Sequence, residues 1–204
     1  MYCFLKKGEQ GFSLIELLIA TVISLVLFTS LFTAFIMQRK AYNVQEQITE
    51  MMQVARAAMD MMGREIKVAG YDLAGLMQKT DPSAADFVGI PYDTSQLEVV
   101  ADLNADGDTS DPNEDIVYAY YTASKQIKRK TGAGSFQPFA EDIQSYQFEY
   151  LDSSGNAATT TANIRRIKIT ITARTAHRDP NYSPNGGYRT YTLTSLIVPT
   201  NLAY

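Results

Sequence analysis

Residues 11–37 read GFSLIELLIATVISLVLFTSLFTAFIM, and this stretch decides how the N-terminal part of the chain folds. From Leu17 to Met37 it contains no charged residue, no glycine and no proline. As a helix with a rise of about 1.5 Å per residue, this part extends about 32 Å, enough to cross the hydrocarbon core of a membrane. A cleaved secretory signal has a shorter apolar core, of about 7–15 residues. The pattern therefore predicts a membrane-spanning helix.

One carboxylate, that of Glu16, lies at the start of this apolar run. A charge at the centre of a spanning helix costs about 2.5–3.5 kcal/mol on insertion scales, so such a group commonly has a partner and a function. The span itself contains no basic residue. We therefore expect the partner of Glu16 to come from outside the span.

The segment Gly11–Leu17, after a short leader that contains lysine and before an apolar helix, resembles the class III signal of type IV pilins and related pseudopilins. The resemblance implies that a prepilin peptidase cuts between Gly11 and Phe12 and that Phe12 is then N-methylated. It also implies that Glu16 pairs with the new amino group on Phe12 of a neighbouring subunit. Such a buried pair contributes register more surely than stability.

The same resemblance implies a leader of residues 1–11, which holds Cys3, the only cysteine of the chain. The positive-inside rule compares the basic residues on the two sides of a span. Two lysines, at 6 and 7, precede this span and two basic residues, Arg39 and Lys40, follow it, so the rule gives no orientation. The expected cytoplasmic N-terminus therefore follows from the resemblance alone. It implies a single-pass protein of the inner membrane, with an extracytoplasmic C-terminal domain, that later enters a pilus fibre. The implied partners are the prepilin peptidase, major and minor pilins, the inner-membrane assembly platform and membrane lipid.

Beyond the span, an apolar stripe at helical spacing predicts that the helix continues to about Val68 and ends at Gly70 and Gly75. We expect an assembly half over residues 12–38 and an amphipathic half over 39–69. The methionines of the stripe suggest either core packing or a binding groove, and we favour core packed on a sheet. The stripe comprises Ile48, Met52, Ala55, Met59, Met62, Ile66 and Ala69.

Residues 70–204 change to a period of two, which predicts strands with one face on the helix. The fold class is therefore α+β, a long N-terminal helix packed on an antiparallel β-sheet domain. The expected strands are Leu97–Ala101, Asp115–Thr122, Gln126–Lys130, Ile143–Leu151, Ile164–Arg174 and Tyr188–Val198.

Four segments of this domain resemble PilW-type minor pilins: Arg64–Tyr71, Asp102–Gly107, Phe148–Tyr150 and Arg165–Arg174. The resemblance implies a low-abundance subunit that helps to initiate pilus assembly at or near the tip. Many major pilins break the apolar half of the helix with glycine or proline, whereas here the first glycine after Phe12 is at position 63. The J-type pseudopilin of type II secretion has a similar layout, so a role in a secretion pseudopilus is an alternative. A pilus-borne adhesin is a further alternative.

Composition and motifs argue against other classes of protein. The 204 residues include a single histidine, which excludes sites built on several imidazoles. Their net charge of −4 leaves no overall basic field that would attract nucleic acid. No nucleophile elbow, P-loop or zinc-protease motif occurs, so we expect no enzyme and no catalytic residue. We expect His177 on a surface loop. The basic run Lys125, Lys128, Arg129 and Lys130 is interpreted as a solvated hairpin edge.

One acidic loop, Asp102–Asp115, reads DLNADGDTSDPNED. Asp102, Asn104 and Asp106 at alternate positions, followed by Gly107, match the opening of an EF-hand loop, although strands flank it in place of helices. The alternative is an ordinary acidic turn, in which these residue types are common. We expect one structural Ca²⁺ and no other cofactor. The expected ligands are Asp102, Asn104, Asp106, Asp108, Asp111 and Glu114.

Overall fold

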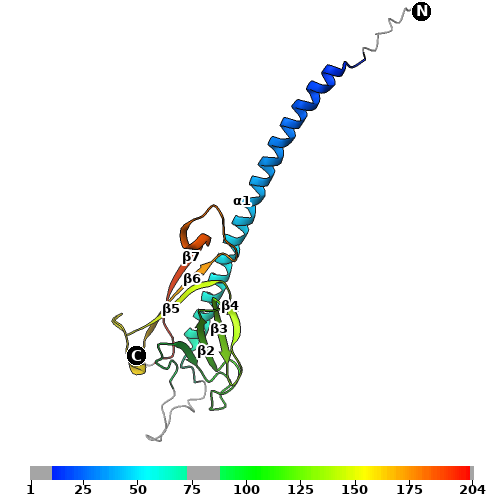
Figure 1. The fold of residues 1–204 in the computed structure, drawn as a ribbon. Helices are drawn as coiled ribbons and strands as arrows, with labels where there is room; N and C mark the ends of the chain where they lie inside the picture. The colour runs from blue at the N-terminus through cyan, green and yellow to red at the C-terminus, as the bar shows by residue number, and fades with distance from the viewer. Residues whose placement is uncertain (1–10, 73–87, 203–204) are drawn as a thin grey trace, which may run out of the picture. The chain divides into compact units, whose positions relative to one another are not determined.

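The computed structural model describes residues 11–72 and 88–202 (Figure 1). Residues 1–10 of the expected leader, and Gly75 as a helix-end signal, lie outside the described residues. The chain divides into two compact units, the first ending at Glu46 and the second beginning at Gln47. The helix α1, Leu14–Val68, supplies residues to both units.

In the first unit, α1 exposes its apolar side chains on every side. Its most apolar 18-residue window has a mean hydropathy of 2.4 and is 0% buried, and α1 is the one helix among the described residues that is long and apolar enough to cross a membrane. Four hydroxyl groups within the span, those of Thr21, Thr29, Ser30 and Thr33, donate to carbonyls of the same helix; Thr29 donates to Leu25 at 2.7 Å and Thr33 to Thr29 at 2.8 Å. The span thus satisfies these polar groups internally, as a helix in lipid must.

In the second unit, α1 buries the predicted stripe. Ala55, Met62 and Ile66 are 0% exposed, and Ile48 and Met52 are partly buried against the core. The burial of Met59 and Met62 confirms that these methionines of the stripe are core residues. The buried face is wider than predicted, because Met51 and Ala58 also lie in it.

Within the described residues, seven strands form two antiparallel sheets. The first sheet has the order β1-β2-β3-β4 and the second the order β5-β6-β7. In chain order the strands are β1 Gln96–Val100, β2 Asp115–Tyr121, β3 Gln126–Thr131, β4 Gln137–Ala140, β5 Ile143–Leu151, β6 Arg166–Arg174 and β7 Thr190–Ile197. Two short 3₁₀ helices, η1 Thr161–Asn163 and η2 Pro184–Gly187, lie before β6 and β7.

The predicted strands are all present, and the structure adds β4. Only four residues long and interrupted by Pro138, β4 carries too weak a pattern to be found from sequence, and it is the edge strand where a proline is tolerated. The prediction that β3 is a hairpin edge is wrong, because β4 pairs with it on its open side. The start predicted for β6 at Ile164 is also wrong, since the turn of η1 ends there and the strand begins at Arg166.

One hydrophobic core joins α1 to both sheets. On β6, Ile167, Ile169 and Ile171 are 0% exposed and alternate with polar residues, as predicted. One contact of α1 is made with each sheet. Arg129 of β3 donates from Nη2 to Glu65 Oε1 at 2.8 Å, while a methyl group on Gly63 would lie 3.9 Å from Ile197 of β7. The amphipathic half of α1 therefore holds the two sheets together.

The chain leaves α1 at Gly70, as predicted. This residue has a φ of +77°, and its N–H donates to the Val100 carbonyl at 2.9 Å. Gly89 binds the same residue from its other backbone group, since the Gly89 carbonyl accepts from the Val100 N–H at 2.8 Å. The two glycine backbones are therefore packed against each other. A methyl group on Gly89 would lie 2.3 Å from the Gly70 nitrogen. Only glycine fits at this contact between two backbones.

This contact predicts opposite effects for two glycine-to-alanine substitutions. Gly89→Ala should lower stability by about 2–3 kcal/mol, because neither backbone can move aside without breaking its hydrogen bond to Val100. Gly63→Ala, within α1 and free of any close contact, should raise stability by about 0.5–1 kcal/mol. Thermal unfolding of the full chain in detergent measures both, and for a chain of this size the first change corresponds to a fall in Tm of about 5–10 °C. Equal midpoints for Gly89→Ala and wild type would contradict the close approach.

Candidate functional site

The first candidate site is the start of α1. Phe12 is 77% exposed, Ser13 occupies the position before the helix, and the Ser13 N–H donates to Glu16 Oε2 at 3.0 Å. This is one half of a capping box, in which a glutamate at the third helical position accepts from the N-cap N–H. A carboxylate in the first turn is also favoured by the helix dipole. Glu16 therefore has a local partner that sequence reasoning missed, although the pair Ser13 and Glu16 at a spacing of three was visible.

This local bond does not neutralise the charge of Glu16, because the partner that the described residues offer is a neutral N–H. Gly11 precedes it in open space, where a methyl group would meet nothing within 4 Å. The structure thus presents Gly11 and Phe12 as an accessible peptide bond directly before a helix. The three predicted residues Gly11, Phe12 and Glu16 lie within one stretch of six positions that is exposed throughout.

The second candidate site is the acidic loop between β1 and β2. Its backbone is tightly turned: Ala105, Gly107 and Asn113 have φ of 66°, 86° and 76°. Asp102, which is 0% exposed, stabilises the turn by accepting from the N–H groups of Ala105 at 2.7 Å and Gly107 at 3.2 Å. The loop is also tied to the end of α1, because the Asp102 N–H donates to the Tyr71 carbonyl.

The structure brings together three of the six residues predicted to bind a metal. One carboxylate oxygen from each of Asp106, Asp108 and Glu114 lies within 4.8 Å of the others. The remaining three have hydrogen bonds within the loop. Asp102 braces the turn, and the Asn104 side-chain amide donates to Asp106 at 2.9 Å and to Asp111 at 2.8 Å.

Glu114 is the buried member of this cluster, at 2% exposed. Its Oε1 accepts from the N–H groups of Leu103 at 2.8 Å and Asn104 at 3.1 Å. Its Oε2 is buried and accepts no hydrogen bond from any described residue. A buried carboxylate oxygen without a partner is costly, so this atom is left able to accept a hydrogen bond or to bind a cation.

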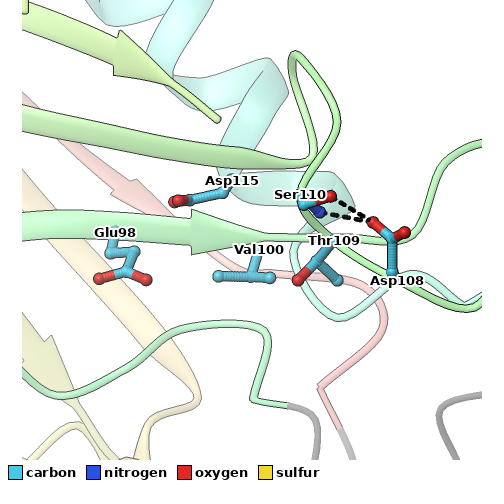
Figure 2. Close-up of a pocket in the computed structure, with 6 residues that line it drawn as sticks. All are labelled: Glu98, Val100, Asp108, Thr109, Ser110 and Asp115. Atoms are coloured by element: carbon cyan, nitrogen blue, oxygen red, sulfur yellow. Dashed lines mark hydrogen bonds between the residues drawn. The ribbon is translucent and has the colours of Figure 1, made fainter. Parts of the chain in front are cut away.

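An acidic pocket of about 440 Å³ adjoins the loop, and Figure 2 shows the side chains that line it. Asp108 forms part of its wall and accepts from the N–H and the hydroxyl of Ser110 at 2.7 and 2.8 Å. These two bonds lower the pKa of Asp108. Burial, followed by the charge of Asp115, raises the pKa of Glu98 on β1. The region around the loop therefore concentrates negative charge.

The other residues considered from sequence are His177 and the basic run. One residue of the basic run contacts the acidic loop, because Arg129 Nη2 donates to Asn113 Oδ1 at 3.1 Å. His177 is exposed on a loop, as predicted, and it contacts α1 through its backbone N–H, which donates to Gln47 at 3.1 Å. The three residues of the basic run that lie on β3 have local partners: Arg129 binds Glu65, Lys130 lies 3.9 Å from Asp115, and Lys128 lies over the ring of Tyr121.

Comparison with known proteins finds two family matches. The sequence model of prepilin peptidase-dependent protein B matches residues 44–197, and that of the prokaryotic N-terminal methylation motif matches residues 6–32. A type IV-like pilin from Thermus thermophilus has a related structure, with 10% sequence identity and a TM-score of 0.45 over 74% of this chain and 97% of that one. No curated protein sequence matches the chain.

Proposed function

The chain belongs to the prepilin peptidase-dependent protein B family and is type IV pilin-like, and on that premise we propose that it is a minor pilin that helps to initiate pilus assembly at or near the tip. The observation that carries the proposal is the combination of parts in one chain. An N-terminal methylation motif over residues 6–32 precedes a domain that matches the family over 44–197. The role is one of assembly and not of catalysis.

The chemistry of the N-terminus supports polymerisation through α1. Cleavage after Gly11 creates a cation on Phe12, four residues before the carboxylate of Glu16. Because the Ser13 N–H already holds that carboxylate at the start of the helix, a neighbouring Phe12 amino group meets a preset acceptor. Pairing between subunits then removes the charge that makes Glu16 costly in an apolar environment.

The exposed apolar half of α1 supports membrane insertion before assembly and helix-to-helix packing afterwards. Leu14, Leu25 and Phe28 are 81%, 70% and 71% exposed, which in water would leave a large apolar surface uncovered. We infer an inner-membrane protein with a cytoplasmic N-terminus and an extracytoplasmic domain. Its partners are then the prepilin peptidase, other major and minor pilins, the assembly platform and lipid.

The first prediction from this proposal concerns processing. The intact mass of the protein purified from membranes should lack residues 1–11 and carry one extra methyl group on Phe12. Gly11→Ala should retain the leader in most of the protein, while leaving the fold unchanged because a methyl group fits there. A strain without the prepilin peptidase gives the uncleaved reference mass. Recovery of the leader in assembled wild-type material would contradict the assignment.

The second prediction separates the two roles open to Glu16. Glu16→Leu should insert into the membrane readily but be incorporated poorly into pili. Glu16→Gln keeps an oxygen that can accept from the Ser13 N–H but removes the charge. If the charge pairs with the Phe12 amino group, this variant should fail as Glu16→Leu does, by about tenfold or more in the sheared pilus fraction. Wild-type incorporation of Glu16→Gln would instead assign the residue to helix capping alone.

The third prediction tests the initiation role. Deletion of the gene should reduce the number of pili per cell much more than it changes the composition of the few that remain, as for an initiator present at few copies. Counting pili by electron microscopy, with the major pilin quantified in the sheared fraction, measures both. Normal pili together with a loss of secreted proteins from the medium would assign the chain to a secretion pseudopilus.

A further inference from the structure

We propose that the loop between β1 and β2 binds one Ca²⁺ through Asp106, Asp108 and Glu114. The proposal concerns the folded domain and does not depend on the function of the chain in pili. Its first support is the spacing of the ligands. Three carboxylate oxygens within 4.8 Å of one another repel unless a cation lies among them, and this is the donor set that a hard divalent cation takes.

The second and independent support is the orphaned oxygen of Glu114. This side chain is 2% exposed, and its Oε1 is already bound by two backbone N–H groups. Its Oε2 is buried and lacks a hydrogen bond from any residue that the structure describes. An ordinary acidic turn keeps its carboxylates in water, so burial of this one is explained if a cation supplies the missing partner.

The hydrogen bonds of the loop separate ligands from supports. Asp102 holds the turn through the N–H groups of Ala105 and Gly107, while Asn104 links the carboxylates of Asp106 and Asp111. Asp102, Asn104 and Asp111 therefore position the loop. This arrangement reduces the six ligands expected from the EF-hand spacing to three carboxylates, with water completing the coordination on the exposed side of Asp106 and Asp108.

Calcium fits this arrangement better than magnesium. Two of the three ligands are exposed and lie on a loop, which suits the variable coordination of Ca²⁺ more than the strict octahedron of Mg²⁺. The bound ion fixes the connection between β1 and β2 and, through the bond from the Asp102 N–H to Tyr71, the chain just after α1. Sites of this kind in extracellular modules have a Kd of about 10⁻⁴–10⁻³ M.

The experiment uses the full-length protein in detergent, with calcium chloride as the probe. Thermal unfolding with 1 mM calcium and with chelator should differ, by about 3–6 °C in midpoint for a Kd of about 10⁻⁴ M. Calorimetric titration should give one site per chain. Magnesium chloride at the same concentration should give a much smaller shift.

Two variants and one matched control locate the site. Asp108→Asn keeps an oxygen for the Ser110 bonds but removes a ligand charge, so the affinity should fall about tenfold or more. Glu114→Gln should do the same. Asp152→Asn changes a carboxylate in a similar exposed turn, which accepts from the Ser154 N–H at 2.8 Å, and should bind calcium as the wild type does.

Each outcome decides the proposal. A calcium-dependent midpoint that is lost in Asp108→Asn and kept in Asp152→Asn supports the site, even if Glu114→Gln fails to fold. Equal midpoints with calcium and chelator, together with no heat of binding, overturn it. So does an equal shift with magnesium, or wild-type calcium affinity in Asp108→Asn. None of these readouts involves pili. The calcium proposal can therefore fail while the assembly role stands, and the assembly role can fail while the calcium proposal stands.

Discussion

The packing of one face of α1 against both sheets is the interaction on which the second unit depends. Met62 and Ile66 are completely buried at the centre of a core to which both sheets contribute. The two sheets are separate hydrogen-bonded ladders, so neither could bury its inner face alone. The helix therefore completes the fold, and the same helix carries the apolar segment. A single element links the folded domain to the segment that carries the N-terminal methylation motif.

The end of that helix explains why the acidic loop lies where it does. Gly70 turns the chain and donates to Val100, and Gly89 packs against the same point through a contact that has no room for a side chain. Just beyond, Tyr71 accepts from the Asp102 N–H at the start of the loop. The loop is thus anchored at its first residue to the end of α1 and at Glu114 to its own backbone. A cation among its carboxylates would add to a region that is already tightly constrained.

At the other end of the helix, the chain combines an apolar surface with one acid. Four hydroxyls of the span are satisfied by its own carbonyls, whereas the partner that the described residues offer to the charged Glu16 is a neutral N–H. The Ser13 N–H orients this carboxylate without neutralising it. Such a group is stable in an apolar environment when a cation arrives from another molecule, and this is the physical basis of the proposal that Glu16 acts in assembly.

The sequence alone determined the features that depend on local pattern. An uncharged run of 21 residues predicts an apolar helix of spanning length, and strict alternation, as on β6, places Ile167, Ile169 and Ile171 in the core. Likewise, Gly70 ends α1 because a left-handed residue is needed there. The motif around Gly11 and Glu16 is also local, so it was readable without a structure.

Tertiary structure decided what depends on contacts between distant residues. Short β4 is a strand because β3 offers it an edge, and Arg129 leaves solvent because Glu65 of α1 lies opposite it. In the sequence, the six polar residues of the acidic loop are equivalent candidates for metal ligands. The folded backbone distinguishes Asp102, which braces the turn, from Glu114, whose buried oxygen has no described partner. Sequence spacing can identify candidate ligands, but burial and hydrogen bonding decide which of them keep an oxygen that is free to bind a cation.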